Sequence, residues 1–265
     1  MRKMIGLLLC LGSLGLWAAA ARAQSSVASL APPVPAKASP QVVRPIDPRW
    51  QSSLEAFAAA DRLHAPRTGG VLFVGSSSIR LWDGLEQAFG GSADAAAEAP
   101  AIIIKRGFGG SRLADVADYL DRLVLPYKPR LVVVYAGDND LAEGRSPQQV
   151  LQSFESLVEE VQRALPDTRI AYVSIKPSPL RESLMARIRE TNALIHDYAA
   201  ATPGLDYIDI HTPMLDPDGR PRAELFRSDR LHLNEAGYAL WKTVISEHLG
   251  APARAPSTAA LHAGP

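Results

Sequence analysis

Short apolar runs alternate with amphipathic stretches between residues 68 and 250, and this alternation restricts the possible folds more than any other feature of the chain. The runs predict five strands, at residues 71–74, 101–105, 131–136, 170–175 and 207–210. Continuous apolar strands separated by helices are typical of a parallel sheet that is buried on both faces. The pattern therefore predicts an α/β fold of three layers, with a five-stranded parallel sheet between two layers of helices.

The stretches between the strands predict helices, and the clearest of these begins near Ser146. Ser146 can cap the helix, Pro147 suits its first position, and Gln149 can reach back to the cap. Apolar residues then recur at helical spacing and indicate one buried face: Val150, Leu151, Phe154, Leu157, Val158, Val161 and Leu165. Other helices are expected at 111–125, at about 181–200 and at 234–249, and one near 49–63 is expected outside the sheet pattern.

The first 23 residues have the pattern of a cleavable signal peptide. Arg2 and Lys3 precede an apolar stretch at residues 4–20, and Ala21-Arg22-Ala23 gives the small-x-small pattern that signal peptidase recognises. An uncleaved membrane anchor is the alternative, because about 17 apolar residues is the shortest stretch that spans a bilayer. We expect cleavage before Gln24, which would make the mature protein periplasmic or secreted, without stable membrane insertion.

Removal of residues 1–23 changes the charge and the cysteine count. The segment holds three of the 28 basic residues, none of the 28 acidic residues and the one cysteine, Cys10, so 25 basic and 28 acidic residues remain, a net charge of −3. The mature protein then has no cysteine for an internal disulfide. A mildly acidic chain without a basic run argues against nucleic acid as a partner.

The remaining ends of the chain differ from its centre. Residues 24–48 and 251–265 are rich in alanine, proline and serine, and a flexible linker and a flexible tail are expected there. No repeat and no Pro- or Gly-rich linker interrupts residues 68–250. We therefore expect one domain, at residues 49–250.

A serine follows the first expected strand, and a carboxylate and an imidazole lie near the other end of the chain. The serine is Ser77, in Gly75-Ser76-Ser77, and the distant pair is Asp229 and His232, three residues apart. Together they are the residues that a Ser-His-Asp hydrolase needs. Each half also has an ordinary structural explanation, because Gly-Ser-Ser is a common turn and Asp-x-x-His is often a capping or surface pair.

Two further segments place polar or flexible residues after strands. Gly110 comes after the second expected strand and Asn139 after the third. Because ligands of open α/β sheets bind beyond the carboxyl ends of the strands, we expect both to converge with the serine and the Asp-x-x-His pair at one edge. Each could instead be a turn former, Gly110 through its backbone freedom and Asn139 through its side chain.

These four segments resemble the sequence blocks of the SGNH hydrolases, also called the GDSL family of esterases and lipases, over roughly residues 68–250. The resemblance implies a flavodoxin-like fold with Ser77 as the nucleophile and Asp229 and His232 as its partners. It also implies an oxyanion hole made of the backbone N–H groups of Ser77 and Gly110 and the side-chain amide of Asn139.

The chain departs from the family pattern at Ser76, where the family usually has Asp. That Asp does not handle the proton, so the departure concerns the support of the turn rather than the chemistry. Ser76 and Ser78 have the same side chain as Ser77, which could alternatively be a helix cap. The register against the family's Gly-x-Ser block selects Ser77 as the nucleophile.

In the chemistry that the resemblance implies, Ser77 attacks an ester carbonyl while His232 takes its proton, which later goes to the leaving alcohol. Asp229 holds the imidazole in the required tautomer. No cofactor or metal is expected, because the chain has no zinc or dinucleotide motif and its glycine-rich segment at 107–110 lacks the Lys-Ser/Thr of phosphate loops. The aspartates at 216 and 218 fit a Pro-Asp-Gly turn.

The expected function is that of an exported serine esterase that acts through a covalent acyl-enzyme on short acyl esters, for example O-acetyl groups of carbohydrates. Its partner would be a small-molecule or glycan ester. A lysophospholipase, a thioesterase and an O-acyltransferase remain alternatives, since the same residues serve each of them. A non-catalytic ester- or glycan-binding domain is a further alternative. The sequence does not set the oligomeric state.

Overall fold

The computed structural model describes residues 45–90 and 102–250 of the 265-residue chain. The expected signal peptide at 1–23, the tail at 251–265 and residues 24–44 of the expected linker lie outside the described residues. Asp47 and Pro48, at the end of that linker, form the start of helix α1 (Pro48–Leu63), where the Asp47 carboxylate accepts the N–H of Arg49. Within the described ranges, no helix is both long and apolar enough to cross a membrane.

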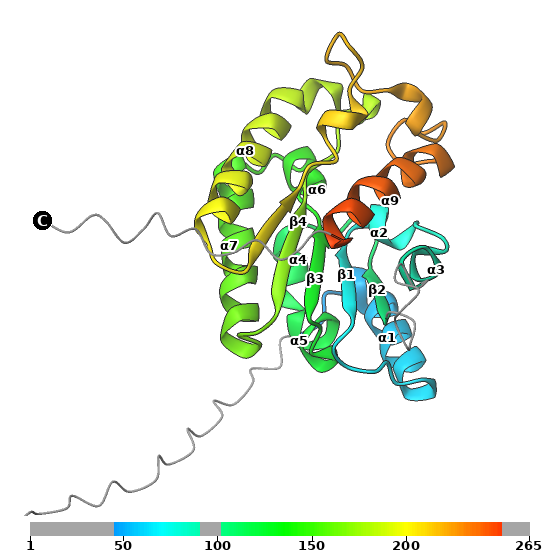
Figure 1. Ribbon diagram of the computed structural model, residues 1–265, viewed down its shortest axis with the longest axis vertical. Coiled ribbons are helices and arrows are strands. Elements are labelled where there is room, and N and C mark those ends of the chain that lie inside the picture. Colours follow the sequence, from blue (N-terminus) through cyan, green and yellow to red (C-terminus); the bar gives the residue numbers. More distant parts are fainter. Residues whose placement is uncertain (1–44, 91–101, 251–265) are drawn as a thin grey trace, which may run out of the picture. The chain divides into compact units, whose positions relative to one another are not determined.

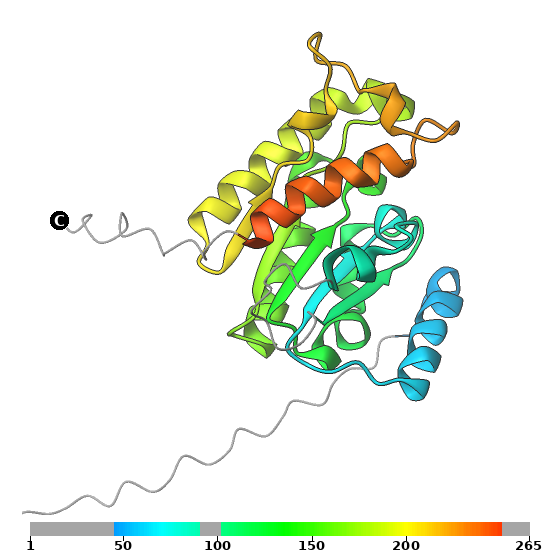
Figure 2. The same cartoon turned by 45° about the vertical axis from the view of Figure 1, so that its right-hand side comes forward.

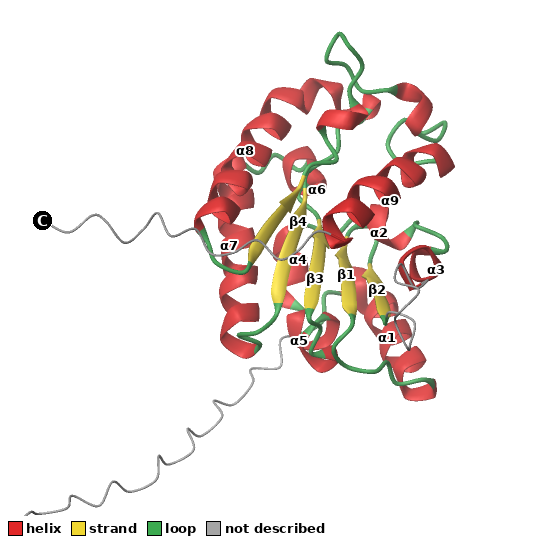
Figure 3. Ribbon diagram, in the orientation of Figure 1, coloured by secondary structure: helices red, strands yellow, loops and turns green. Residues whose placement is uncertain are grey.

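Five strands form one sheet in which all neighbouring strands are parallel (Figures 1 and 3). Their order is β2-β1-β3-β4-β5, with these bounds: β1 Val71–Gly75, β2 Ile103–Gly107, β3 Leu131–Tyr135, β4 Arg169–Val173 and β5 Leu205–Ile208. The predicted five-stranded parallel sheet is thus confirmed. This order is also that of the flavodoxin-like fold, in which ligands bind where the strand order reverses, between β1 and β3.

Helices cover both faces of the sheet, because alternate residues of each strand face opposite sides. Leu72 and Val74 pack in one core cluster and Val71 and Phe73 in the other. The first cluster includes residues of α1, α4 (Leu113–Asp118), α5 (Leu120–Leu123), α7 (Pro147–Ala164) and α8 (Met185–Ala201). The second includes residues of α2 (Ser77–Arg80), α3 (Leu85–Gly90) and α9 (Glu235–Gly250). The turned view in Figure 2 shows α9 crossing one face of the sheet.

Several strand bounds differ from the expected ones. β2 continues past residue 105, because Arg106 and Gly107 pair with the last two residues of β1. β4 ends at Val173 rather than at residue 175, and β5 lies two residues earlier than expected. Ser174 explains this end of the sheet, since its side-chain oxygen accepts the N–H groups of Ile210 and His211, both at 3.0 Å. At residues 210 and 211, hydrogen bonds to the Ser174 side chain thus take the place of the strand-to-strand backbone hydrogen bonds that the sequence pattern predicts.

Helix α7 begins as the sequence predicts. Ser146 Oγ accepts the N–H of Gln149 at 3.2 Å, and Gln149 Oε1 accepts the N–H of Ser146 at 2.9 Å. The expected core face is buried, apart from Leu151 and Leu165, which are half-buried. The expected helices at 49–63 and 234–249 are likewise present as α1 and α9, within a residue of their expected bounds.

The segment 111–125 is not the single helix that its periodicity predicts. It forms α4 and α5, which are separated at Tyr119, and a 3₁₀ turn at Leu125–Tyr127 follows. Tyr119 leaves helical geometry with φ −118° and ψ 23°, and its hydroxyl accepts the N–H of Asp47 at 2.9 Å. This long-range bond joins the break to the segment before α1. The expected helix at 181–200 starts later, at Met185, because Pro179–Leu184 is a 3₁₀ helix.

Candidate active site

The turn between β1 and α2 presents Ser77 at the carboxyl edge of the sheet. Gly75 ends β1 with φ +143°, and a Cβ at this position would lie 1.8 Å from the carbonyl oxygen of Tyr135. Only glycine therefore fits there. Ser76 is fully buried and its N–H donates to the same Tyr135 oxygen at 2.9 Å. This backbone hydrogen bond stabilises the turn at position 76, where the family usually has Asp.

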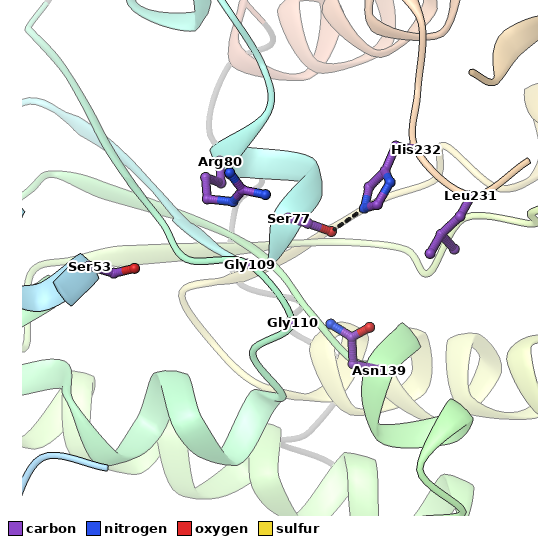
Figure 4. A pocket seen from close by; sticks show the side chains of 8 residues that line it. All are labelled: Ser53, Ser77, Arg80, Gly109, Gly110, Asn139, Leu231 and His232. Atoms are coloured by element: carbon purple, nitrogen blue, oxygen red, sulfur yellow. Dashed lines mark hydrogen bonds between the residues drawn. The ribbon is translucent and has the colours of Figure 1, made fainter. Parts of the chain in front are cut away.

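Ser77, His232 and Asp229 form a continuous hydrogen-bonded series. His232 Nε2 lies 3.1 Å from Ser77 Oγ (Figure 4), and on the other side of the ring His232 Nδ1 lies 2.7 Å from Asp229 Oδ2. One ring nitrogen therefore faces the hydroxyl and the other faces the carboxylate. This geometry allows the imidazole to take the hydroxyl proton while the carboxylate fixes the tautomer and stabilises the resulting positive charge.

The loop at 229–232 holds Asp229 in place for this contact. Asp229 Oδ1 accepts the N–H groups of Leu231 and His232, both at 2.9 Å, and Arg230, between Asp229 and Leu231, adopts φ +60°. Burial opposes ionisation of Asp229, but hydrogen bonds from the backbone and ring of His232 and from Leu231 outweigh it and lower the pKa of Asp229 to about 2. Asp229 is therefore ionised throughout the neutral pH range.

The three expected oxyanion donors lie around the same pocket. Ser77, Gly110, Asn139 and His232 all line a pocket of about 500 Å³ (Figure 4). The N–H groups of Ser77 and Gly110 donate to no acceptor in the described part of the chain. Asn139 Nδ2 uses one hydrogen for the carbonyl oxygen of Ser111, at 3.0 Å, and has a second to donate. Such an arrangement can stabilise a negative charge that develops on a carbonyl oxygen.

Gly110 has a conformation that suits this role. Its φ is +80°, in the left-handed region that glycine adopts without strain, and it lies in the loop between β2 and α4. Asn139 lies opposite, in the short helix α6 (Asp138–Ala142) after β3. Buried Asp140 joins the two segments, because its Oδ2 accepts the N–H of Leu113 at 3.1 Å. Burial raises the pKa of Asp140 to about 6, although this N–H favours its charged form.

Arg181, which the sequence analysis did not single out, fixes the orientation of the Asn139 amide. Arg181 Nη2 donates to Asn139 Oδ1 at 2.8 Å, so the amide nitrogen is turned toward the pocket. Arg181 Nη1 also lies 3.0 Å from Asp138 Oδ2, and Lys176 Nζ lies 2.8 Å from the same oxygen. Burial opposes the charge of Asp138, but the two cations outweigh it and lower the pKa of Asp138 to about 2. No local spacing in the sequence signals this network, because its members are about 40 residues apart.

Four further residues line the pocket: Ser53, Arg80, Gly109 and Leu231. None of them was expected at the site from the sequence. Nowhere in residues 45–90 or 102–250 do three His, Cys, Asp or Glu side chains gather closely enough to hold a metal ion.

The model of the GDSL-like Lipase/Acylhydrolase family matches residues 73–240, which include Ser77, Gly110, Asn139, Asp229 and His232. The chain belongs to this family. The match spans all five strands except the first two residues of β1, and it confirms the resemblance on which the site was predicted. Members of an acylhydrolase family cleave acyl groups from esters, so the chain is a hydrolase that acts on esters.

Solved structures share this fold. A putative platelet activating factor from Streptococcus pneumonia aligns with a TM-score of 0.65 and 21% identity over 76% of this chain and 92% of its own. A GDSL-like lipase from Bacteroides thetaiotaomicron gives 0.62 and 20% over 74% and 96%. A carbohydrate esterase family 3 protein from Talaromyces cellulolyticus gives 0.53 and 19% over 69% and 96%. No curated protein matches the chain.

Proposed function

We propose that this acylhydrolase is a serine esterase that cleaves short acyl esters through a covalent acyl-enzyme on Ser77. The observation that carries the proposal is the series from Ser77 Oγ to His232 Nε2 and from His232 Nδ1 to Asp229 Oδ2, at 3.1 and 2.7 Å. These distances lie within the range in which a base can activate a hydroxyl nucleophile.

In the first half of the reaction, Ser77 Oγ attacks the ester carbonyl carbon and its proton passes to His232 Nε2. The carbonyl oxygen becomes an oxyanion, which accepts hydrogen bonds from the N–H groups of Ser77 and Gly110 and from Asn139 Nδ2. The C–O bond to the alcohol then breaks, and His232 gives the proton to the leaving oxygen. The products of this half-reaction are the free alcohol and the acyl group on Ser77.

In the second half, water attacks the acyl-enzyme carbonyl and gives its proton to His232. The oxyanion forms again in the same hole and collapses with release of Ser77 Oγ, which takes the proton back from His232. The carboxylic acid leaves and the enzyme returns to its starting state. If a sugar hydroxyl took the place of water, the same residues would act as an acyltransferase.

The character of the pocket supports a short acyl group. Of the residues that line it, Leu231 is the one with an aliphatic side chain, whereas sites for long acyl chains are lined mainly by apolar residues. The solved carbohydrate esterase from Talaromyces cellulolyticus shares the fold of this chain. O-acetyl groups of carbohydrates are therefore the first substrate class to test. We also propose export through the predicted signal peptide at 1–23, which would place the substrate outside the cytoplasm.

A panel of p-nitrophenyl esters of increasing acyl length, run beside acetylated xylan and lysophospholipid, tests the function. We expect the highest kcat/KM with acetyl or propionyl esters, release of acetate from xylan, and no turnover by Ser77→Ala. A maximum at long acyl chains, or turnover of lysophospholipid alone, would instead favour a lysophospholipase. Binding of esters without any turnover would indicate a non-catalytic domain. Addition of sugar acceptors would detect acyl transfer.

A further inference from the structure

Arg80 lies one helical turn after the proposed nucleophile and reaches into the same pocket. Both residues belong to α2, and residues three apart in a helix project from the same side, with Cβ atoms about 5–6 Å apart. In Figure 4 the guanidinium lies beside the loop at Gly109, on the other side of the Ser77 side chain from His232. A Cβ on Gly109 would lie 2.8 Å from Arg80 Nε, so the glycine leaves the space that this side chain fills.

The charge of Arg80 is not neutralised within the described ranges. Its side chain makes neither an ion pair nor a hydrogen bond with any residue there, and none of the residues that line the pocket has a carboxylate. Two other arginines near the site are paired. Arg112 lies 2.9 Å from Asp115 Oδ1, and Arg181 lies 3.0 Å from Asp138 Oδ2. Arg80 therefore gives this end of the pocket a positive charge that a ligand can reach.

Ser53 adds a hydrogen-bond donor at the same end. It lies on α1, and its hydroxyl points toward the pocket in Figure 4. Two contacts hold α1 against β2 and the loop that follows it: the Trp50 ring packs edge-on against Phe108 of the loop at 5.3 Å, and Asp61 pairs with buried Arg106 of β2 at 2.5 Å. Helix α1, which lies outside the strand-helix pattern, thus completes the wall of the pocket.

We propose that Arg80, assisted by the hydroxyl of Ser53, binds a carboxylate group of the substrate, so that the preferred ester is acidic. A planar guanidinium can hold a carboxylate with two parallel hydrogen bonds. Because Arg80 lies only three residues after Ser77 on α2, a carboxylate held by Arg80 would lie within a few bonds of the ester carbonyl that Ser77 attacks. The inference rests on the proposed esterase function and narrows its substrate class. The carboxylate belongs either to the acyl part or to the alcohol part of the ester.

Two pairs of matched esters distinguish these sources. Mono-p-nitrophenyl succinate and p-nitrophenyl butyrate differ in a carboxylate on the acyl part, and 4-acetoxybenzoate and its methyl ester differ in a carboxylate on the alcohol part. For each pair, kcat/KM of the acidic ester is divided by that of the neutral ester, in wild type and in Arg80→Gln. Comparison of the two proteins cancels the intrinsic reactivity of each ester.

In at least one pair, we expect Arg80→Gln to lower the acidic-to-neutral ratio roughly tenfold, mainly through KM, because a charged hydrogen bond is lost at a site open to water. Ser53→Ala should lower the ratio less, and higher salt should reduce the preference of the wild type. Arg67→Gln is the control for the loss of one positive charge, since exposed Arg67 lies before β1, at the opposite end of that strand from Ser77.

Ratios that agree between wild type and Arg80→Gln in both pairs, with all four esters hydrolysed, would overturn the assignment of Arg80 and leave the esterase function intact. An equal fall of the ratio in Arg67→Gln would also overturn it, because the effect would then reflect net charge. If the wild type hydrolysed none of the four esters, the proposed function itself would fail, and this inference with it.

Discussion

Arg181 donates a hydrogen bond from Nη2 to Asn139 Oδ1 at 2.8 Å, and this contact determines which end of the Asn139 amide faces Ser77, the proposed nucleophile. With the oxygen occupied by Arg181, the Nδ2 group points toward Ser77 and Gly110 (Figure 4). Asp138 holds Arg181 through an ion pair, and Lys176 pairs with the same carboxylate oxygen of Asp138. An amide that is oriented in advance needs no reorganisation when the oxyanion forms, which is the condition for effective electrostatic catalysis.

Asn139→Ala should lower kcat by about 10²–10³, the usual cost of one lost oxyanion donor, with a smaller change in KM. The amide contacts the charge that develops in the transition state, so its loss should affect the chemical step more than binding. Steady-state kinetics on the best p-nitrophenyl ester measures both constants. A raised KM with a normal kcat would make Asn139 a binding or turn residue.

Arg181→Ala should lower kcat because the Asn139 amide loses its fixed orientation, and we expect a fall of about tenfold, less than for loss of the amide itself. The decisive readout is a double-mutant cycle, in which Arg181→Ala has little further effect in the Asn139→Ala background. Arg189→Ala, on an exposed position of α8, controls for the loss of charge. Equal effects of Arg181→Ala in both backgrounds would show that Arg181 acts by another route.

His232 must be neutral to accept the Ser77 proton, so kcat/KM should rise with pH through a single ionisation as the imidazole loses its proton. The pKa of Asp229, lowered to about 2, keeps this carboxylate ionised between pH 5 and 8, so it does not produce the acidic limb. His232→Ala should be nearly inactive. A flat profile from pH 5 to 8 would show that the base lies elsewhere.

Asp229→Asn should keep the fold and lose about 10²–10⁴-fold in kcat, because the imidazole then lacks its tautomer and the charge that stabilises the imidazolium. Circular dichroism checks the fold, and steady-state kinetics measures the loss. Exposed Asp197→Asn, on α8, is the matched control for the same chemical change. An Asp229→Asn variant of normal activity would make the loop at 229–232 a structural feature.

Asp140 should make the protein less stable as pH rises from about 4 to 6. Its pKa in the folded state, about 6, is above the ordinary value of 3.8, so the unfolded chain loses this proton first. The two pKa values correspond to a fall of about 3 kcal/mol in the free energy of unfolding. Urea titrations of wild type and Asp140→Asn at pH 4 and 7 test this. Titration of the other groups affects the stability of both proteins and therefore cancels when the two are compared.

The variant should gain stability relative to wild type by up to that amount between the two pH values. Its amide oxygen can still accept the N–H of Leu113, so the link between α6 and α4 is kept. The same stability difference at pH 4 and pH 7 would show that Asp140 is not penalised by burial.

The sequence pattern predicted the sheet well, because strands that are buried on both faces must be apolar throughout, as Val71–Gly75 and Leu131–Tyr135 are. The resemblance to the SGNH hydrolases pointed to residues that the structure places around one pocket. Elements of four to six residues, such as α2 and α6, were not predicted, since they are too short to show helical periodicity. The break at Tyr119 was also not predicted.

The sequence also could not predict that three further residues reach the site, for a related reason: Arg181, Arg80 and Ser53. Each reaches the site through tertiary contacts: Arg181 from a 3₁₀ helix 42 residues after Asn139, and Ser53 from α1. An arginine in a helix is an ordinary surface residue until the fold shows what surrounds it. These contacts depend on how α1, α2 and the loop after β4 meet at one edge of the sheet.

The identity of the nucleophile is the central claim, and peptide mass spectrometry after treatment with a fluorophosphonate tests it most directly. Ser77 is the serine of this turn whose hydroxyl faces His232 Nε2, at 3.1 Å, whereas Ser76 and Ser78 are buried. We predict one phosphonyl group on Ser77, loss of activity in step with labelling, and no labelling of His232→Ala on the same time scale. Labelling of Ser76 or Ser78, or inactivation without any modified serine, would contradict the account.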